Sequence, residues 1–249
     1  MAYDPASLDA PFAALKAYDW GADAAAFQPI DAAVVAAHGD AGLRTALESR
    51  LAALLGEGTS RAAKEYICRK LSLIGTAASV PALASLLPQR EHSHMARFAL
   101  ERIAAPEAAT ALRKAAETVE GDLKIGMVSS LAGKGDTAAV PLLAGMLQSD
   151  RRLAIAAAEA LGRLATPEAS QALAAIAGVK DPAVAAAVVD ARLACAEAFL
   201  HQGKRAEALS LYKSLEAATT TGGTSSAAKN AAIAVSRGIL ACLDTSSPS

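Results

Sequence analysis

Aromatic residues and strand-like patterns are both scarce in this sequence. Only 4% of its 249 residues are Phe, Trp or Tyr. Val and Ile never alternate with polar residues over the length of a strand, although such alternation is typical of a half-buried β-strand. The absence of this pattern excludes a sheet and predicts an all-α chain.

Long hydrophobic runs are also missing. Arg, Lys, Glu or Asp interrupts every apolar run well before the roughly 18 residues that a membrane helix needs. The first residues, MAYDPASLDAPF, contain neither a basic n-region nor an apolar h-region, so the sequence as given carries no signal peptide. A signal peptide already removed would leave no trace in it. We therefore expect a soluble chain without membrane contact, and a cytoplasmic and a periplasmic location both stay open.

The sequence has no excess of positive charge. It contains 24 basic and 25 acidic residues, for a formal net charge of −1. Proteins that bind nucleic acid through its phosphates normally show a surplus of Lys and Arg or a basic stripe. A nucleic-acid partner is therefore not expected.

Motifs for metal, cofactor or catalysis are absent. The three cysteines, Cys68, Cys195 and Cys242, are far apart and form no CxxC pair, so they are interpreted as small buried hydrophobic residues. His92 and His94 lack a third ligand nearby, and Ser129 and Ser130 have no candidate base. We expect no metal, no cofactor and no enzymatic activity.

Alanine and a repeated helical pattern are what the sequence does contain. Alanine supplies roughly a quarter of the residues, and it is the best helix former. The segment 151–178 predicts two short helices, 151–164 and 167–177, with Thr166 capping the second and Pro167 in its first turn. Neither helix is long enough to be stable alone, so each must bury its apolar face against neighbours.

The helical pattern repeats with a period near 30. Leucines at equivalent places of successive first helices are spaced 29, 31 and 30 residues apart; they are Leu71, Leu100, Leu131 and Leu161. Two helices in each unit of this period indicate an α-solenoid of stacked antiparallel helix pairs. A second level of repetition is visible, because GTAASVPALASLL (75–87) matches GDTAAVPLLAGML (135–147) and IAAPEAATAL (103–112) matches LATPEASQAL (164–173). These offsets of 60 and 61 residues indicate a duplicated block of two repeats.

These motifs carry a family resemblance. The segments ALGRLATPEASQAL (160–173) and IGTAASVPALASLL (74–87) resemble short HEAT repeats, also called phycobilisome-lyase-like HEAT repeats. The combination of YDWG, CRKLSLIGTAASVPALASLL (68–87) and HMARFALERI (94–103) is similar to HEAT-repeat proteins of planctomycete and verrucomicrobial type. The resemblance implies a HEAT-like solenoid, a role as scaffold, adaptor or accessory subunit, and an extracytoplasmic location without an assigned activity. Residues 191–217 look like a tetratricopeptide helix pair.

The expected organisation follows from these patterns. Residues 1–58 are predicted to form an N-terminal helical cap in which Tyr18, Trp20 and Phe27 cover the first repeat. Four HEAT-like repeats are expected in 59–181, a longer tetratricopeptide-like pair in 182–218, a flexible loop in 219–226, and a terminal helix with its tail in 227–249.

The predicted function is protein binding. The second helices are expected to line a groove for an extended peptide or a protein edge, through small and polar residues: Ser85, Gln89, Thr110, Arg113, Lys114, Gln148, Gln171, Lys204 and Lys213. The terminal helix is apolar on more than one face, so Val235, Ile239 and Cys242 are expected to contact a further domain of a longer chain, a partner or a second copy. The alternatives to a non-enzymatic scaffold are an accessory or chaperone-like subunit of an enzyme and an N-terminal structural domain of a longer protein.

Overall fold

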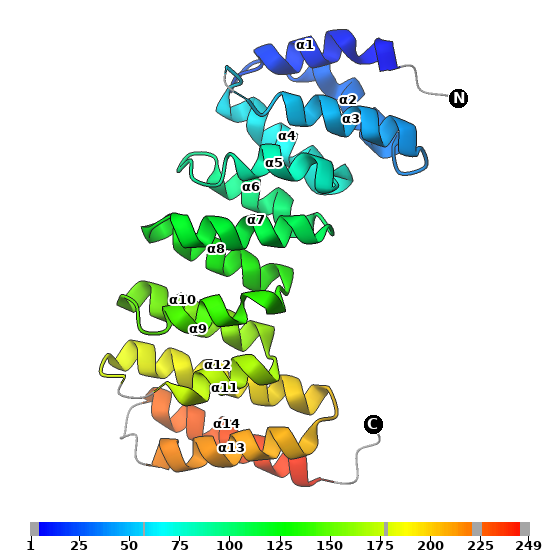
Figure 1. The fold of residues 1–249 in the computed structure, drawn as a ribbon. Coiled ribbons are helices and arrows are strands. Elements are labelled where there is room, and N and C mark those ends of the chain that lie inside the picture. The colour runs from blue at the N-terminus through cyan, green and yellow to red at the C-terminus, as the bar shows by residue number, and fades with distance from the viewer. Residues whose placement is uncertain (1–4, 57, 177–178, 221–225, 245–249) are drawn as a thin grey trace. The chain divides into compact units, whose positions relative to one another are not determined.

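The computed structural model describes residues 5–56, 58–176, 179–220 and 226–244 (Figure 1). Every regular element among these residues is a helix, and no strand occurs in them. The chain divides into two compact units, Met1–Lys134 and Gly135–Ser249. The all-α solenoid of stacked helix pairs predicted from the period near 30 is confirmed.

The first unit, coloured blue to green in Figure 1, is built from eight α-helices and three 3-10 turns among the described residues. In chain order these are η1 (Pro5–Leu8), α1 (Asp9–Ala17), η2 (Ala25–Phe27), α2 (Gln28–Ala36), α3 (Ala41–Ala53), α4 (Arg61–Ile74), η3 (Ala77–Ser79), α5 (Val80–Ala84), α6 (Ser93–Arg102), α7 (Pro106–Thr118) and α8 (Gly121–Lys134).

Like helices stack on like helices in this unit. The first helices α4 and α6 pack together, as do α6 and α8, while the second helices α5 and α7 pack on each other. Leu71, Leu100 and Leu131 are completely buried between them. The register predicted from the leucine spacing is therefore confirmed for these helices.

The N-terminal part of the unit packs differently from the prediction. Phe27 is buried and makes edge-to-face contacts with Tyr18 and Tyr66, with ring centroids 4.8 and 4.9 Å apart. Trp20, however, is 89% exposed, so its predicted role in covering the first repeat is wrong. It lies in a turn where its backbone N–H donates to the Asp19 carboxylate and Gly21 has a φ of 88°. This turn leaves the indole in solvent instead of against the helices.

The second unit, coloured green to red in Figure 1, begins with the short helix α9 and ends with longer helices. Its elements are η4 (Thr137–Ala139), α9 (Val140–Met146), α10 (Arg151–Leu164), α11 (Pro167–Ala175), α12 (Pro182–His201), α13 (Arg205–Thr220) and α14 (Ser226–Leu243). The duplicated Thr-Ala-Ala and Val-Pro segments form the same 3-10 turn and short helix in both units, η3–α5 and η4–α9.

Helix ends in this unit follow local sequence signals. The Thr166 hydroxyl accepts a hydrogen bond from Ala169 N at 3.1 Å, with Pro167 in the first turn, so the predicted cap is confirmed. Ala165 adopts the left-handed conformation, with a φ of 46°, between α10 and α11. Gly203, with a φ of 75°, follows the end of α12 as the sequence predicts.

The structure can be compared with the predicted domain boundaries in two places. The boundary between the units lies at Lys134, inside the block 59–181 predicted to hold four repeats. Of the predicted loop 219–226, residues 219 and 220 belong to α13 and residue 226 begins α14, while 221–225 lie outside the described residues. The predicted tail beyond Asp244 also lies outside them.

Candidate functional site

A groove of about 660 Å³ lies between the second helices α5 and α7 of the first unit. Local sequence signals position both walls. The Thr76 hydroxyl accepts a hydrogen bond from Ala78 N, which starts η3 and leads into α5. Helix α7 begins at Pro106. Proline lacks an N–H, but no hydrogen bond is lost here because the first N–H groups of a helix have no intrahelical acceptor. Glu107 lies at the positive end of the helix dipole.

The groove has an apolar floor and a rim rich in proline. Its lining comes from α5 with the turn after it and from one face of α7: Val80, Pro81, Ala84, Leu87, Pro88, Pro106, Glu107, Thr110, Ala111, Lys114, Ala115, Thr118 and Val119. The α7 residues recur every three or four positions, as residues on one helical face do. From Pro106 to Val119 this face extends over roughly 20 Å.

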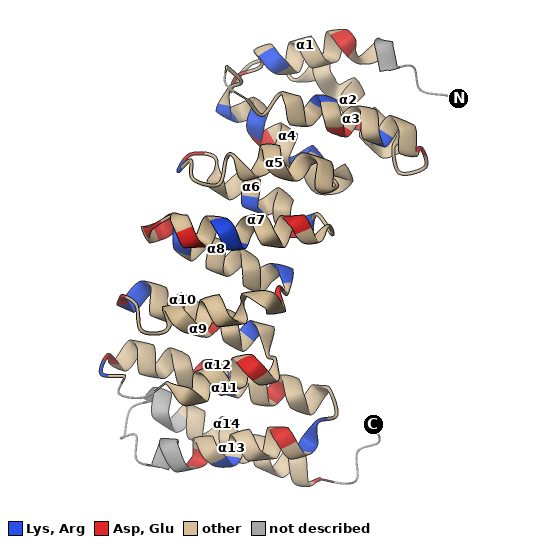
Figure 2. Ribbon diagram, viewed as in Figure 1, with Lys and Arg blue, Asp and Glu red and all other residues tan. Residues whose placement is uncertain are grey.

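Few polar groups in the groove remain available to a ligand. The hydroxyl of Thr110 donates to Pro106 O at 3.2 Å, and that of Thr118 donates to Ala115 O at 3.2 Å. The exposed side chains of Glu107 and Lys114 have no hydrogen-bond or ion-pair partner within the described part of the chain. Helix α7 thus brings both signs of charge to this surface (Figure 2).

The predicted groove residues of the first unit are only partly brought together. Thr110 and Lys114 line the groove. Ser85, Gln89 and Arg113 are not among the lining residues, and their side chains bond locally. Ser85 donates to Ala82 O at 2.8 Å and Gln89 to Ser85 O at 2.9 Å, while Arg113 donates to the Thr110 hydroxyl at 3.0 Å.

The predicted groove residues of the second unit are dispersed. Gln171 is exposed on α11, and Lys213 is exposed on α13. The Lys204 ammonium lies 5.5 Å from the centre of the Phe199 ring. Gln148 lines a separate hollow of about 410 Å³ beside the starts of α10 and α12.

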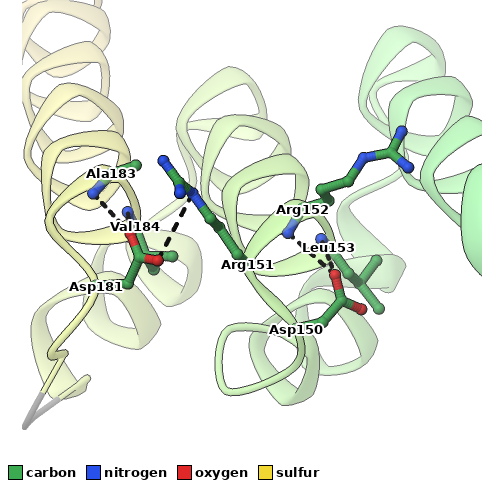
Figure 3. A network of polar contacts seen from close by, with 7 residues as sticks. All are labelled: Asp150, Arg151, Arg152, Leu153, Asp181, Ala183 and Val184. Atoms are coloured by element: carbon green, nitrogen blue, oxygen red, sulfur yellow. Dashed lines mark hydrogen bonds and ion pairs between the residues drawn. The ribbon is translucent and has the colours of Figure 1, made fainter.

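Figure 3 shows the polar network at this hollow. The Asp150 carboxylate accepts from the backbone of Arg152 and Leu153 and caps α10, and the Asp181 carboxylate accepts from the backbone at the start of α12. Arg151 Nε lies 3.6 Å from Asp181 Oδ2. Both carboxylates therefore serve the helix starts, so the network is structural rather than a ligand site.

The residues predicted to make contacts at the C-terminal edge face the core of the second unit instead of solvent. Val235 and Cys242 are buried in a cluster formed by α12, α13 and α14, and Ile239 packs against the same cluster. The helical period turns this face toward Tyr212 and Leu215, so the predicted contact residues are occupied within the chain. The apolar residues of α14 that do face solvent are Ile233, Leu240 and Leu243, with exposures of 52%, 67% and 58%.

Buried polar side chains join successive first helices. The fully buried Ser130 hydroxyl donates to Glu101 Oε1 at 2.6 Å and accepts from Arg97 Nη1 at 3.0 Å. Lys134, part of the Gly-Lys-Gly sequence, donates its ammonium to the carbonyls of Leu100 and Ile103 at the end of α6. These groups link α6 to α8 and so hold successive repeats together.

Side chains of the kinds that bind metals do not gather into a metal centre in the described part of the chain. No group of three or more His, Cys, Asp and Glu side chains there is placed to hold a metal ion. His92 precedes α6 and contacts Gln89, while His94 is exposed in the first turn of that helix. Burial lowers the pKa of His92, with the nearby Lys64 acting in the same direction.

An aromatic hollow near the N-terminus was not predicted. It has a volume of about 370 Å³ and is lined by Tyr18, Trp20, Phe27 and Tyr66, with Asp31 and Glu65 among the polar residues. Both carboxylates already have internal partners, since Lys70 lies 2.6 Å from Asp31 and Arg69 lies 2.5 Å from Glu65. Tyr66 also donates to Asp31 at 2.7 Å. The clustering of Tyr18, Trp20 and Phe27 in the sequence is the signal from which this hollow could have been predicted.

Part of this chain matches a known protein family. Residues 112–191 match the family model described as HEAT repeats. The chain is an all-α helical repeat protein in which this part resembles HEAT repeats. An engineered protein solved by a structural genomics consortium is similar at 20% identity, covering 86% of this chain and 97% of its own, with a TM-score of 0.42. No curated protein matches the chain. Among the described residues, no helix combines the length and apolarity needed to cross a membrane.

Proposed function

We propose that this protein is a non-enzymatic scaffold that binds an extended segment of a partner protein in the groove between α5 and α7. The observation that carries this proposal is the groove itself, whose mainly apolar lining follows α7 for about 20 Å and includes exposed prolines and two charged side chains. HEAT repeats are commonly protein-interaction scaffolds, and this supports the same role.

The lining of the groove favours a protein ligand over a reaction. Its floor is built from alanine, valine and leucine, and its two threonine hydroxyls donate to the backbone of their own helix. Its charged groups, Glu107 and Lys114, lie two helical turns apart, roughly 10 Å, which is too far for one to transfer a proton to the other directly. Apolar contact with a few orienting charges is typical of peptide recognition.

Peptide selection against the purified chain tests this proposal. A display library of random, unstructured peptides is selected on the immobilised chain, and enriched peptides are synthesised with a fluorescent label and titrated by anisotropy. Replacing Ala111 with Arg fills the floor of the groove, so we expect Ala111→Arg to weaken binding at least tenfold. Ala36→Arg makes the same change on an exposed position of α2 and should leave binding unchanged. Peptides that bind Ala111→Arg as well as the wild type would place the binding site elsewhere.

A second candidate role is self-association through α14. Ile233, Leu240 and Leu243 are spaced seven and three residues apart and therefore share one face of this helix, exposed to solvent. We propose a second copy of the chain as the occupant, because an apolar stripe of this spacing is self-complementary in a two-fold helix pair.

A further inference from the structure

The groove between α5 and α7 carries opposite charges at a fixed spacing among small residues. Glu107 and Lys114 lie seven residues apart on α7, so they share one face of the helix and are separated by about 10.5 Å along its axis. Ala84, Ala111 and Ala115 in the same lining leave room for the backbone of a further helix to approach closely. The groove therefore suits a helix with apolar side chains and two opposite charges, two turns apart.

The exposed face of α14 has these features. Ile233, Leu240 and Leu243 are exposed on it, and so are Arg237 and Asp244. Asp244 continues the last helical turn, because its N–H donates to Leu240 O at 3.0 Å. By helical spacing all five residues share one face, and the two charged ones lie on the same edge of it, about 10.5 Å apart.

The order of the charges on α14 is the reverse of that on α7. From the N-terminus to the C-terminus, α7 presents Glu107 and then Lys114, while α14 presents Arg237 and then Asp244. If the two helices run parallel, Arg237 lies beside Glu107 and Asp244 lies beside Lys114. An antiparallel arrangement brings like charges together, so the charges select one direction for the helix in the groove.

The same register places the apolar residues of α14 against the lining. Leu240 lies midway between the two charges of α14, so it faces Ala111, which lies midway between those of α7. Ile233 precedes Arg237 by one turn and faces the start of α7, where Pro106 is exposed. Burial of these side chains supplies the affinity, and the charges fix direction and register.

The charged side chains are accessible for such a contact. Arg237, Glu107 and Lys114 are exposed and have no hydrogen-bond or ion-pair partner within the described part of the chain. The carbonyl of Asp244 accepts from Arg205 Nη1 at 2.7 Å, and its exposed carboxylate offers several acceptor sites. The stripe on α14 is exposed within one copy of the chain, so covering it in this way requires a second copy.

We propose that α14 of one copy docks parallel to α7 in the groove of a second copy. The contact joins two different surfaces, so further copies can add head to tail. This inference rests on the proposed function for the groove as a binding surface and goes beyond it, because α14 of another copy competes there with a partner segment. It also gives the second copy a contact surface other than its own α14, namely its groove.

Two variants, each blocked at one surface, provide the test. Ala111→Arg fills the groove and leaves α14 intact, whereas Leu240→Glu places a charge on α14 and leaves the groove intact. In sedimentation equilibrium each variant alone should stay monomeric, and an equimolar mixture should form a one-to-one heterodimer. A two-fold pair of α14 helices predicts instead that Ala111→Arg dimerises alone and that the mixture contains no heterodimer.

An exchange of charges tests the register. Glu107→Lys should weaken self-association of the full chain about fivefold, because an attractive pair becomes a repulsive one. Adding Arg237→Glu to the same chain should restore it. Glu117→Lys makes the same change at an exposed position of α7 outside the groove and should leave self-association unchanged. All three positions are exposed, so these variants decide the question even if Ala111→Arg does not fold.

The other outcomes are equally definite. A mixture without heterodimers, or a double variant that associates no better than Glu107→Lys alone, would show that α14 does not occupy the groove in this register. If peptides from the random library bind the groove while no heterodimer forms, the proposed function stands and this inference fails. If heterodimers form while no peptide binds, the groove serves self-association and the proposed partner segment is wrong.

Discussion

The carboxylate of Glu48 in α3 accepts three hydrogen bonds from the segment that starts η3, two of them from Thr76. Thr76 N donates at 2.6 Å and the Thr76 hydroxyl at 2.9 Å, and Ser79 N donates at 3.1 Å. Glu48 is only 3% exposed. This buried acid satisfies backbone donors that the turn between α4 and α5 leaves without a helical partner.

We predict that Glu48→Leu destabilises the chain by about 2–4 kcal/mol, because it leaves buried donors unsatisfied. Ser49→Ala, on the exposed neighbouring position, should change the free energy of unfolding by less than about 0.5 kcal/mol. Urea unfolding followed by circular dichroism measures both. Similar midpoints for the two variants would show that these hydrogen bonds contribute little to stability.

Two glycines inside helices should respond oppositely to alanine. A Cβ at Gly238 of α14 would lie 2.2 Å from the buried Tyr212 ring, whereas a Cβ at Gly145 of α9 would meet nothing within 4 Å. We predict that Gly145→Ala stabilises by about 0.5–1 kcal/mol through helix propensity. Gly238→Ala should destabilise by about 1–3 kcal/mol because α13 and α14 must separate. Thermal unfolding of both variants checks this pair, and stabilisation by both would mean that Tyr212 moves freely.

Helix limits and the repeat register could be predicted from the sequence because they depend on local signals. The predicted helix 151–164 is α10, and Thr166 caps α11 as expected. Spacing alone placed Leu71, Leu100, Leu131 and Leu161 in the buried core. Periodicity reports which side of a helix is apolar, and for interior repeats that side is the core.

The candidate site could be predicted only in part, because it depends on which helix faces meet. Spacing identified Thr110 and Lys114, but the walls of the groove are prolines and alanines with no polar signal. On α14 the sequence shows apolar residues on several faces, and nothing local distinguishes Val235, which packs on Tyr212, from Leu240, which faces solvent. The structural role of Glu48 could not be predicted from the sequence either, because the residues that donate to its carboxylate are 28 and 31 positions away along the chain.

Alkaline pH should destabilise the chain through its buried thiols. Burial raises the pKa of Cys68 from 9.0 to about 12 and that of Cys195 from 9.0 to about 11. Between about pH 9 and 11 the unfolded chain loses thiol protons that the folded chain retains, so the unfolded state binds fewer protons and stability falls as pH rises. Each thiol contributes up to about 1.4 kcal/mol per pH unit.

Cys68→Ala removes one of these groups. We expect this variant to have a lower stability at pH 7, where the loss of packing acts alone, and a shallower decline of stability from pH 9 to 11. Urea midpoints at several pH values, measured in a reducing buffer, give both slopes. Parallel curves for wild type and variant would show that the Cys68 thiol ionises as readily in the folded chain as in the unfolded one.

Self-association through α14 predicts a concentration-dependent mass that depends on one exposed leucine. Leu240 lies between Ile233 and Leu243 on the exposed stripe of this helix, so a charge there must be desolvated if two copies pair. We expect sedimentation equilibrium to show dimers of the wild-type chain at high concentration and only monomers of Leu240→Glu. Leu73→Glu is the matched control, because Leu73 is a similarly exposed leucine, at 57%, on α4 of the first unit. That variant should dimerise like the wild type. A wild-type chain that stays monomeric throughout, or dimers that Leu73→Glu disrupts and Leu240→Glu does not, would remove α14 as the contact surface.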